Sequence, residues 1–369
     1  MGPRASRRML AIVMVDTSRT PIDSSLAGVV VAETAIAWVD PVRGAFLRGY
    51  SLAELAERCA YEAVAHVVLR GDLPHEVSAF ADLLSAITLD PDKEGIARAL
   101  GRVLGADQGL VAAIPLAGED DWWLDPPSAL LRILGRLPNV VSAVRGATPP
   151  PRGTYAARCL HALGATRDDV PALRALEVLL SLETEHGLSA STFACRVAAS
   201  SGASPAAALA AAAATLSGPR HGGATADARA LLRDIAASGD AVGKVRARRA
   251  QKLVFPGFGH RIYKGADPRL PPLRAAIDAM SDVPLKAAAL ALEAAVREVF
   301  APKVLHSNID LWGAVLLDAL GVAPEMYVAA FALGVGPGWL AHFDEQMSTS
   351  RLIRPESAYV GPAERSVPR

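Results

Sequence analysis

The chain has 369 residues, enough to bury a large core in one big domain or two unequal ones. Its 38 Lys and Arg residues balance its 38 Asp and Glu residues, and no run of basic residues stands out. A surface for nucleic acid or an anionic membrane is therefore not indicated, and the expected partners are small molecules or further copies of the chain.

The three cysteines indicate a reducing compartment. Cys59, Cys159 and Cys195 are widely spaced and form neither a Cys-x-x-Cys pair nor a Cys/His ligand pattern. This usage is typical of reduced thiols in a cytoplasmic protein and disfavours a disulfide framework or a metal site.

The first 27 residues are interpreted as a poorly ordered leader. Arg4, Arg7 and Arg8 precede a short apolar run that resembles a signal peptide, but the run ends at Asp16 and no small-residue cleavage pattern follows. No apolar stretch reaches the ~20 residues of a membrane span without charge or helix-breaking residues. We therefore expect no membrane association.

The predicted elements beyond the leader are overwhelmingly helical. Helix starts are indicated by a capping hydroxyl or carboxylate and by proline in the first turn. Strand patterns are scarce, and the main candidate is a short hairpin arm at Gly28–Ala37. The sequence therefore predicts an all-α protein, with helix starts at Ser51, Asp168 and Ser204, helices over Ala224–Ala237, Pro284–Phe300 and Leu311–Leu320, and a Pro-rich loop at 147–153.

Two histidines lie in glycine-rich turns. His221 is in Ser217-Gly-Pro-Arg-His-Gly-Gly223, and His260 is in Phe255-Pro-Gly-Phe-Gly-His-Arg-Ile-Tyr-Lys264. Glycine allows close backbone approach and positive φ, so each imidazole is expected to face a cleft. Imidazole transfers protons readily near neutral pH, and Asp310 adds a carboxylate. The three residues together predict general acid–base chemistry.

These turns belong to an ordered set of motifs. The set resembles the citrate synthase family, most closely its shorter bacterial citrate and 2-methylcitrate synthases, and the resemblance spans nearly the whole chain. Each motif alone is only moderately specific, whereas the ordered set is highly specific. The motifs are Gly28-Val-Val-Val-Ala-Glu-Thr-Ala-Ile36, Leu47-Arg-Gly-Tyr-Ser51, His186-Gly-Leu-Ser-Ala-Ser-Thr192, Gly218-Pro-Arg-His-Gly-Gly223, Gly257-Phe-Gly-His-Arg-Ile-Tyr-Lys264, Asp267-Pro-Arg269, Asn308-Ile-Asp310 and Arg351-Leu-Ile-Arg-Pro355.

The resemblance implies an architecture and a reaction. It implies a two-domain helical fold in an intertwined homodimer, with a large domain at 28–223 and 315–369 and a small domain at 224–314 that closes over the substrate. The implied reaction is a Claisen-type condensation of acetyl-CoA or propionyl-CoA with a 2-oxo acid, by default oxaloacetate, followed by thioester hydrolysis. Acyl-CoA is then a co-substrate, and no tightly bound cofactor or metal is expected.

The resemblance also implies residue roles. Asp310 matches the base that removes the α-proton, His221 the donor to the thioester oxygen, and His260 the donor to the ketone oxygen. His186, Arg269 and Arg354 match residues that hold the oxo acid, Arg354 from the other subunit. The segment implied to receive CoA consists of Leu253, Val254, Phe255, Pro256, Gly257, Phe258 and Gly259.

The chain departs from the family where the oxo acid binds. Val335 occupies the position of a further carboxylate-binding arginine, and Gly336 and Pro337 are expected to distort the helix that presents it. Ser189 replaces the usual asparagine. Arg220, where the family usually has leucine, is either a compensating cation or merely an exposed arginine. We hypothesise that the chemistry is kept while the oxo-acid specificity has changed.

Three functions remain open at this point. The first is citrate or 2-methylcitrate synthesis. The second is the same condensation on a non-standard 2-oxo acid in a specialised pathway. The third is a non-catalytic dimeric homologue, which the intact set of His221, His260 and Asp310 disfavours.

Overall fold

The computed structural model describes residues 25–26, 28–349 and 351–367. Residues 35–369 form one compact unit that contains every helix and strand named here. The leader expected at 1–27 lies almost entirely outside the described residues. The described helices are α1 (Leu52–Arg58), α2 (Tyr61–Arg70), α3 (Val77–Ala86), α4 (Pro91–Leu104), α5 (Ala106–Ala113), α6 (Pro126–Val144), α7 (Tyr155–Leu163), α8 (Val170–Glu183), α9 (Ala190–Ser200), α10 (Pro205–Leu216), α11 (Ala224–Ser238), α12 (Ala241–Ala250), α13 (Leu270–Asp278), α14 (Lys286–Phe300), α15 (Ile309–Ala319) and α16 (Tyr327–Thr349), with 3₁₀ turns η1 (Ile114–Ala117), η2 (Trp122–Leu124) and η3 (Pro324–Met326).

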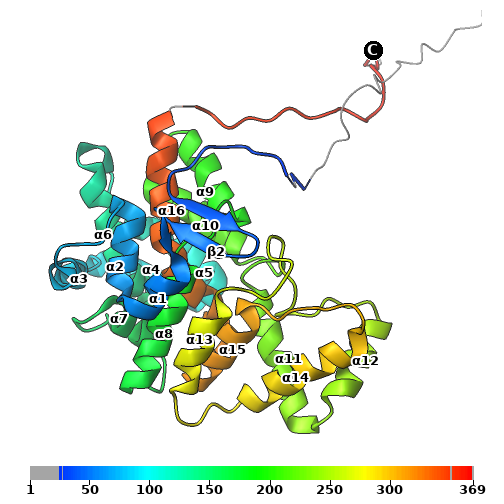
Figure 1. Ribbon diagram of the computed structural model, residues 1–369. Helices are drawn as coiled ribbons and strands as arrows, with labels where there is room; N and C mark the ends of the chain where they lie inside the picture. Colours follow the sequence, from blue (N-terminus) through cyan, green and yellow to red (C-terminus); the bar gives the residue numbers. More distant parts are fainter. Residues whose placement is uncertain (1–24, 27, 350, 368–369) are drawn as a thin grey trace, which may run out of the picture. The chain divides into compact units, whose positions relative to one another are not determined.

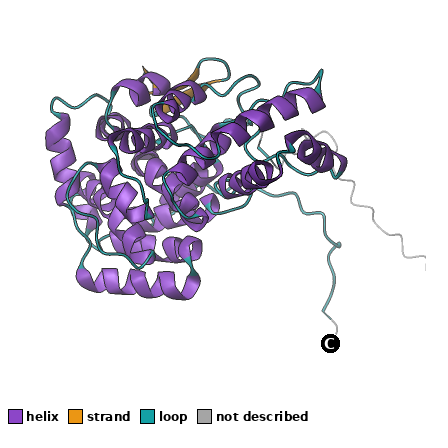
Figure 2. Ribbon diagram, turned by 90° about the horizontal axis from the view of Figure 1, so that it is seen from below, coloured by secondary structure: helices purple, strands orange, loops and turns teal. Residues whose placement is uncertain are grey.

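The all-α class is confirmed (Figure 2). The predicted helix starts are also confirmed by side-chain caps. Ser51 accepts from the Glu54 amide at the start of α1, Asp169 from the Ala172 amide at α8, and Ser204 from the Ala207 amide at α10. Each cap satisfies an amide that has no partner inside its helix.

The predicted hairpin at Gly28–Ala37 is wrong in position. Residues 28–36 are in no strand, and the small antiparallel sheet consists of β1 (Ala37–Asp40), β2 (Gly44–Leu47) and β3 (Tyr50–Ser51) in the order β1-β2-β3. The carboxylate of Asp40 fixes the β1–β2 turn by accepting from the amides of Val42 and Arg43, both at 2.8 Å. This local turn chemistry, rather than the upstream apolar run, sets the position of the hairpin.

Helix α16 is the central element of the core. It contacts α2, α6, α8, α9 and α10, and Figure 1 shows it among these helices. Together with η3 it is long and apolar enough to cross a membrane by length and composition alone, but almost all of it is buried inside the protein. It is therefore the core helix of a globular unit.

Gly336 and Pro337, which were expected to distort the helix, do not end it, because α16 continues through both residues to Thr349. Proline has no amide hydrogen, so the carbonyl of Leu333 loses its helical donor. The hydroxyl of Tyr61 replaces that donor, lying 2.9 Å from the carbonyl oxygens of both Leu333 and Gly334, and the Tyr155 hydroxyl lies 3.4 Å from the same Leu333 oxygen. A buried side chain from α2 thus compensates for the proline.

A second group of helices follows the His221 turn. Helix α11 packs on α14 and α15, and α12 packs on α14, while α13 and α15 also contact α8 (Figure 1). These helices include the three that were expected at Ala224–Ala237, Pro284–Phe300 and Leu311–Leu320, with boundaries shifted by one or two residues. The division into domains at 28–223 with 315–369 and at 224–314 stays a prediction.

Candidate active site

The turn that carries His221 joins α10 to α11. Its backbone is closed by hydrogen bonds from the amides of His221 to Gly218 and of Gly222 to Leu216, both at 2.9 Å. None of its glycines has positive φ, contrary to the expectation from sequence. Glycine is required here because there is no room for a side chain. A Cβ at Gly222 would lie 2.9 Å from the Leu216 carbonyl oxygen.

The ring of His221 is held by a serine. Its Nε2 lies 3.0 Å from Oγ of Ser191, which also accepts from Nε1 of Trp339 at 3.4 Å. Because Ser191 Oγ accepts from the indole, its hydroxyl can donate to His221 Nε2, and in that arrangement the imidazole proton is on Nδ1. Burial lowers the pKa of His221, so the ring is neutral at pH 7. A neutral donor therefore remains on Nδ1.

In the turn that carries His260, glycine is needed because the backbone is in the left-handed region. Gly257 and Gly259 have φ of 79° and 80°. The Nδ1 of His260 accepts from the amides of Ile262 at 3.2 Å and Tyr263 at 3.1 Å. The neutral ring must then carry its proton on Nε2. Burial, followed by nearby Arg269, lowers the pKa of His260 to about 4, so this group too is a neutral donor at pH 7.

Arg269 is buried beside His260. Its Nε and Nη2 bind the two carboxylate oxygens of Asp267 at 3.0 and 2.8 Å, and its Nη1 lies 3.5 Å from Oε1 of Glu183. Burial alone would lower the pKa of Arg269, but Asp267 and Glu183 outweigh it and raise that pKa. Arg269 Nη2 and His260 Nε2 are 3.5 Å apart. With its proton on Nε2, His260 places an N–H group beside the guanidinium, and two neighbouring donors of this kind can bind one acceptor oxygen.

His186 completes this cluster. Its ring centroid lies 5.2 Å from those of His260 and Tyr263, and its Nε2 is 2.6 Å from the Tyr263 hydroxyl. Burial, then Arg269 and His260, hold the pKa of His186 well below its usual value. The predicted residues His186, His260 and Arg269 are therefore brought together.

Asp310 lies in the first turn of α15. Asn308 caps this helix by accepting from the Asp310 amide at 3.1 Å, and Thr225 of α11 donates to Asp310 Oδ1 at 3.0 Å. Burial raises the pKa of Asp310, which the Thr225 hydrogen bond and Arg269 partly oppose. Thr225 stands four residues after His221, so it links the His221 turn to the carboxylate.

The expected CoA segment, Leu253–Gly259, is tied to the residues just before Asp310. The amide of Asn308 donates to Gly257 O at 2.9 Å, and the amide of Gly259 donates to His306 O at 2.8 Å. Leu253 and Val254 are exposed, whereas Phe255 is buried. The segment thus presents apolar side chains and leads directly into the catalytic cluster.

The remaining predicted residues are not brought into contact with His260 or Arg269. Ser189 caps α9 and bonds Ser191, the partner of His221. Arg220 and Arg354 have exposed side chains and, among the described residues, no hydrogen bond or ion pair. Val335 is half-buried on α16. Likewise, His221 contacts neither His260 nor Asp310 within the described part of the chain.

Sequence reasoning missed several residues that shape the site. Tyr263 follows His260 by three residues and Asp267 precedes Arg269 by two, so the motifs themselves contained the signal. Glu183 and Thr225 come from distant helices, and no local pattern marks them. Their roles depend on tertiary contacts alone.

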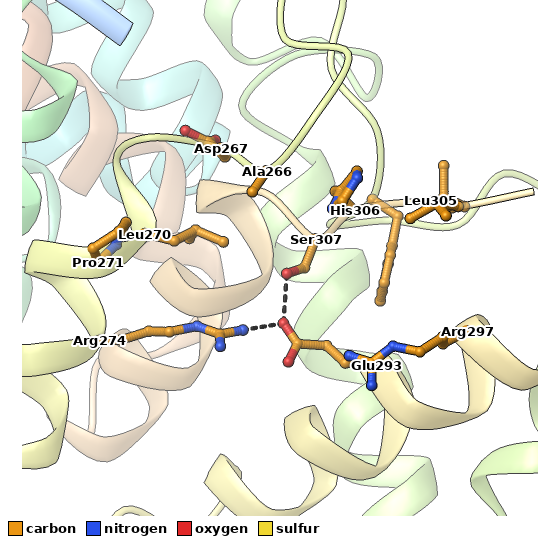
Figure 3. Close-up of a pocket in the computed structure, with 12 residues that line it drawn as sticks. Ala266, Asp267, Leu270, Pro271, Arg274, Glu293, Arg297, Leu305, His306 and Ser307 are labelled. Carbon is orange, nitrogen blue, oxygen red and sulfur yellow. Dashed lines mark hydrogen bonds and ion pairs between the residues drawn. The ribbon is translucent and has the colours of Figure 1, made fainter. Parts of the chain in front are cut away.

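A cavity of about 330 Å³ adjoins the cluster and is lined in part by Asp267 and Phe258. Figure 3 shows Glu293 of α14 on its wall, receiving hydrogen bonds from Arg274 and from Ser307, the latter at 2.5 Å. Trp312 Nε1 of α15 donates to the same carboxylate at 3.0 Å. Glu293 thus joins α13, α14 and α15 around the segment that leads to Asp310.

This fold and donor set define an acid–base enzyme of the condensing type, and comparison with known proteins identifies its family. Residues 25–356 match the family model described as citrate synthase, C-terminal domain. Citrate synthase from Synechocystis sp. is 30% identical over 366 residues, covering 94% of this chain and 92% of that protein. The 2-methylcitrate synthase of Mycobacterium tuberculosis is 31% identical over 400 aligned positions, covering 100% and 99%.

A solved citrate synthase structure has the same fold as this chain. Citrate synthase from Thermoplasma acidophilum, in ternary complex with carboxymethyl coenzyme A and oxaloacetate, superposes with a TM-score of 0.80 at 27% identity, covering 94% of this chain and 98% of that chain. The chain belongs to the citrate synthase family. It is an enzyme of the acyltransferase type that uses acyl-CoA as a co-substrate and needs no tightly bound cofactor.

Proposed function

We propose that the enzyme condenses a short acyl-CoA with a 2-oxo acid and then hydrolyses the thioester. The observation that carries this proposal is the placement of three half-buried groups: His221 held by Ser191, His260 beside Arg269, and the Asp310 carboxylate held by Thr225. Names of relatives support oxaloacetate as the first acceptor to test and acetyl-CoA or propionyl-CoA as donors.

The first step forms a nucleophile from the thioester. Asp310 removes the α-proton through Oδ2, because Oδ1 is bound by Thr225, and His221 Nδ1–H stabilises the developing enolate oxygen. The enol carbon then forms a bond to the ketone carbon. His260 Nε2–H gives its proton to the ketone oxygen, which becomes the hydroxyl, while Arg269 beside it stabilises the developing charge. Water then adds to the thioester carbonyl, releasing the carboxylate and the CoA thiol.

Three further features belong to this proposal. Arg354 is exposed on an extended segment, in keeping with a role in the site of a second subunit of a homodimer. Closure of residues 224–314 over the substrates would exclude water from the enol. Free thiols, with Cys159 and Cys195 buried, agree with a cytoplasmic location.

Thiol release tests the reaction. Acetyl-CoA and propionyl-CoA are each mixed with oxaloacetate and with a panel of other 2-oxo acids, and free CoA is measured. Acceptor-dependent release that Asp310→Asn lowers by about 10²–10⁴-fold is expected. Release that is unchanged in Asp310→Asn would refute the base, and no release with any pair would favour a non-catalytic homologue.

A further inference from the structure

Tyr263 lies between the two histidines that match oxo-acid residues. Its hydroxyl oxygen is 2.6 Å from Nε2 of His186, and its ring is stacked on that of His260, with the ring centroids 4.5 Å apart and the planes 21° from parallel. Among the described residues, His186 is the only hydrogen-bond partner of the hydroxyl. The tyrosine is 2% exposed, so water cannot readily take the place of this hydroxyl beside His186.

The hydrogen bond fixes the orientation of the His186 ring. Burial raises the pKa of Tyr263 to about 12. Burial, followed by Arg269 and His260, holds the pKa of His186 well below its usual value. The phenol and the imidazole are therefore both neutral at pH 7, and one of them donates a hydrogen bond to the other. Turning the imidazole over would replace Nε2 by a ring carbon and break the bond, so the hydroxyl selects one of the two ring orientations.

His260 is held by the same residue in two ways. The Tyr263 amide donates to His260 Nδ1 at 3.1 Å, and the Tyr263 ring stacks on the imidazole. The amide belongs to the backbone and stays after substitution, whereas the stack needs an aromatic side chain. Arg269 lies near the same ring, with its guanidinium carbon 5.9 Å from the centroid. One tyrosine thus contacts three residues of the cluster.

Tyr263 also joins segments that are distant in the sequence. His186 follows α8, whereas His260 and Tyr263 lie between α12 and α13. The hydroxyl contact therefore crosses the predicted division between residues 28–223 and 224–314. In the described part of the chain, it is the one hydrogen bond that links His186 to the turn of His260. It consequently sets how the two imidazoles are placed relative to each other.

We propose that Tyr263 is a positioning residue for the oxo acid, with its hydroxyl holding His186 and its ring holding His260, so that both imidazoles meet one acceptor molecule in fixed orientations. The inference rests on the proposed condensation and adds to it a residue that transfers no proton itself. The two parts of the side chain have separable effects. The hydroxyl acts on binding of the acceptor through His186, and the ring acts on proton transfer through His260.

Tyr263→Phe removes the hydroxyl and keeps the ring, whereas Tyr263→Leu removes both. Binding of oxaloacetate, pyruvate and 2-oxobutanoate is measured by calorimetry, and kcat and both KM values by thiol release with acetyl-CoA and propionyl-CoA. For the acceptor that the wild type binds best, Tyr263→Phe should raise Kd and KM by about tenfold and leave kcat and the KM for acyl-CoA within about twofold. Tyr263→Leu should also lower kcat by about tenfold or more. Tyr50→Phe, at a tyrosine whose hydroxyl has no described hydrogen bond, is the matched control and should leave these values unchanged.

The readouts separate this inference from the proposed function. Absence of thiol release with every acceptor, with binding still weakened about tenfold in Tyr263→Phe, would refute the condensation and retain Tyr263 as the positioning residue. Thiol release with Kd and KM of the acceptor within about twofold of the wild type in Tyr263→Phe would overturn the inference and retain the condensation. An equal rise in the KM for acyl-CoA would also overturn it, because a general loss of structure affects both substrates. Binding of no 2-oxo acid by the wild type would overturn both. Tyr263→Phe gives this test on its own should Tyr263→Leu unfold, since it keeps the ring on His260.

Discussion

The Tyr61 hydroxyl lies 2.9 Å from the carbonyl oxygen of Leu333, the group that Pro337 deprives of its helical donor. Tyr61 is fully buried and stacks on Tyr155, with ring centroids 4.8 Å apart. Helix α16 continues past the position of Val335 and through Pro337 to Thr349.

Tyr61→Phe should lower the free energy of unfolding by about 1 kcal/mol, because it removes the shorter of two tyrosine hydrogen bonds to the buried Leu333 carbonyl and leaves only that of Tyr155, at 3.4 Å. Chemical denaturation measures this loss. Adding Pro337→Ala restores the missing amide, so it should cost less in the Tyr61→Phe background than in the wild type. Tyr50→Phe, which removes no described hydrogen bond, should change stability by no more than about 0.5 kcal/mol. Equal effects of Tyr61→Phe and Tyr50→Phe would contradict the role of the hydroxyl.

Glu293 is expected to be a stability residue rather than a catalytic one. Its side chain is 15% exposed and accepts hydrogen bonds from Arg274, Ser307 and Trp312. Glu293→Ala leaves the Arg274 charge unpaired over the Trp312 ring, so we expect a loss of about 2–4 kcal/mol, reduced somewhat by the solvent that reaches Arg274.

Glu298→Ala is the control on the same helix, because Glu298 pairs with Arg246 where both side chains are more than half exposed. It should cost less than about 1 kcal/mol. Thermal and denaturant unfolding of both variants measure the two losses in free energy of unfolding. A loss for Glu293→Ala no larger than that for Glu298→Ala would show that the three-donor network contributes little.

The pH dependence of kcat/KM should report Asp310. Burial raises the pKa of this carboxyl, and the base must be ionised, so activity should fall as the pH drops through that raised pKa. The Thr225 hydrogen bond favours the ionised form. Thr225→Val should therefore move the acid limb of the profile to higher pH, by up to about one pH unit. Thr215→Val, the same change in α10, should leave the limb in place. An acid limb that moves to lower pH in Thr225→Val would contradict the assignment.

Sequence reasoning reached the family and the helical class, because the motifs around His221, His260 and Asp310 are local and the helix starts are marked by local caps. It failed at the hairpin, where the turn made by Asp40 overrides an apolar run at 28–36. It also gave no sign of how Pro337 is accommodated, because the Tyr61 hydroxyl that bonds the Leu333 carbonyl comes from 276 residues away in the sequence. Glu183 was missed for the same reason: its importance lies in a 3.5 Å approach to Arg269 from another helix. Pairings between distant segments leave no local pattern.

Arg354 gives the sharpest test of the proposed homodimer. Its side chain is exposed on the segment after α16, and within the described residues it reaches no member of the catalytic cluster. If each site combines Asp310 of one subunit with Arg354 of the other, Asp310→Asn and Arg354→Ala homodimers should both be poorly active. A mixed dimer would hold one site with both substitutions and one intact site. Unfolding and refolding the two variants together should then restore about a quarter of wild-type thiol release. No recovery, in mixtures shown to contain mixed dimers, would place Arg354 outside the partner's site. Full activity of Arg354→Ala alone would remove it from the site altogether.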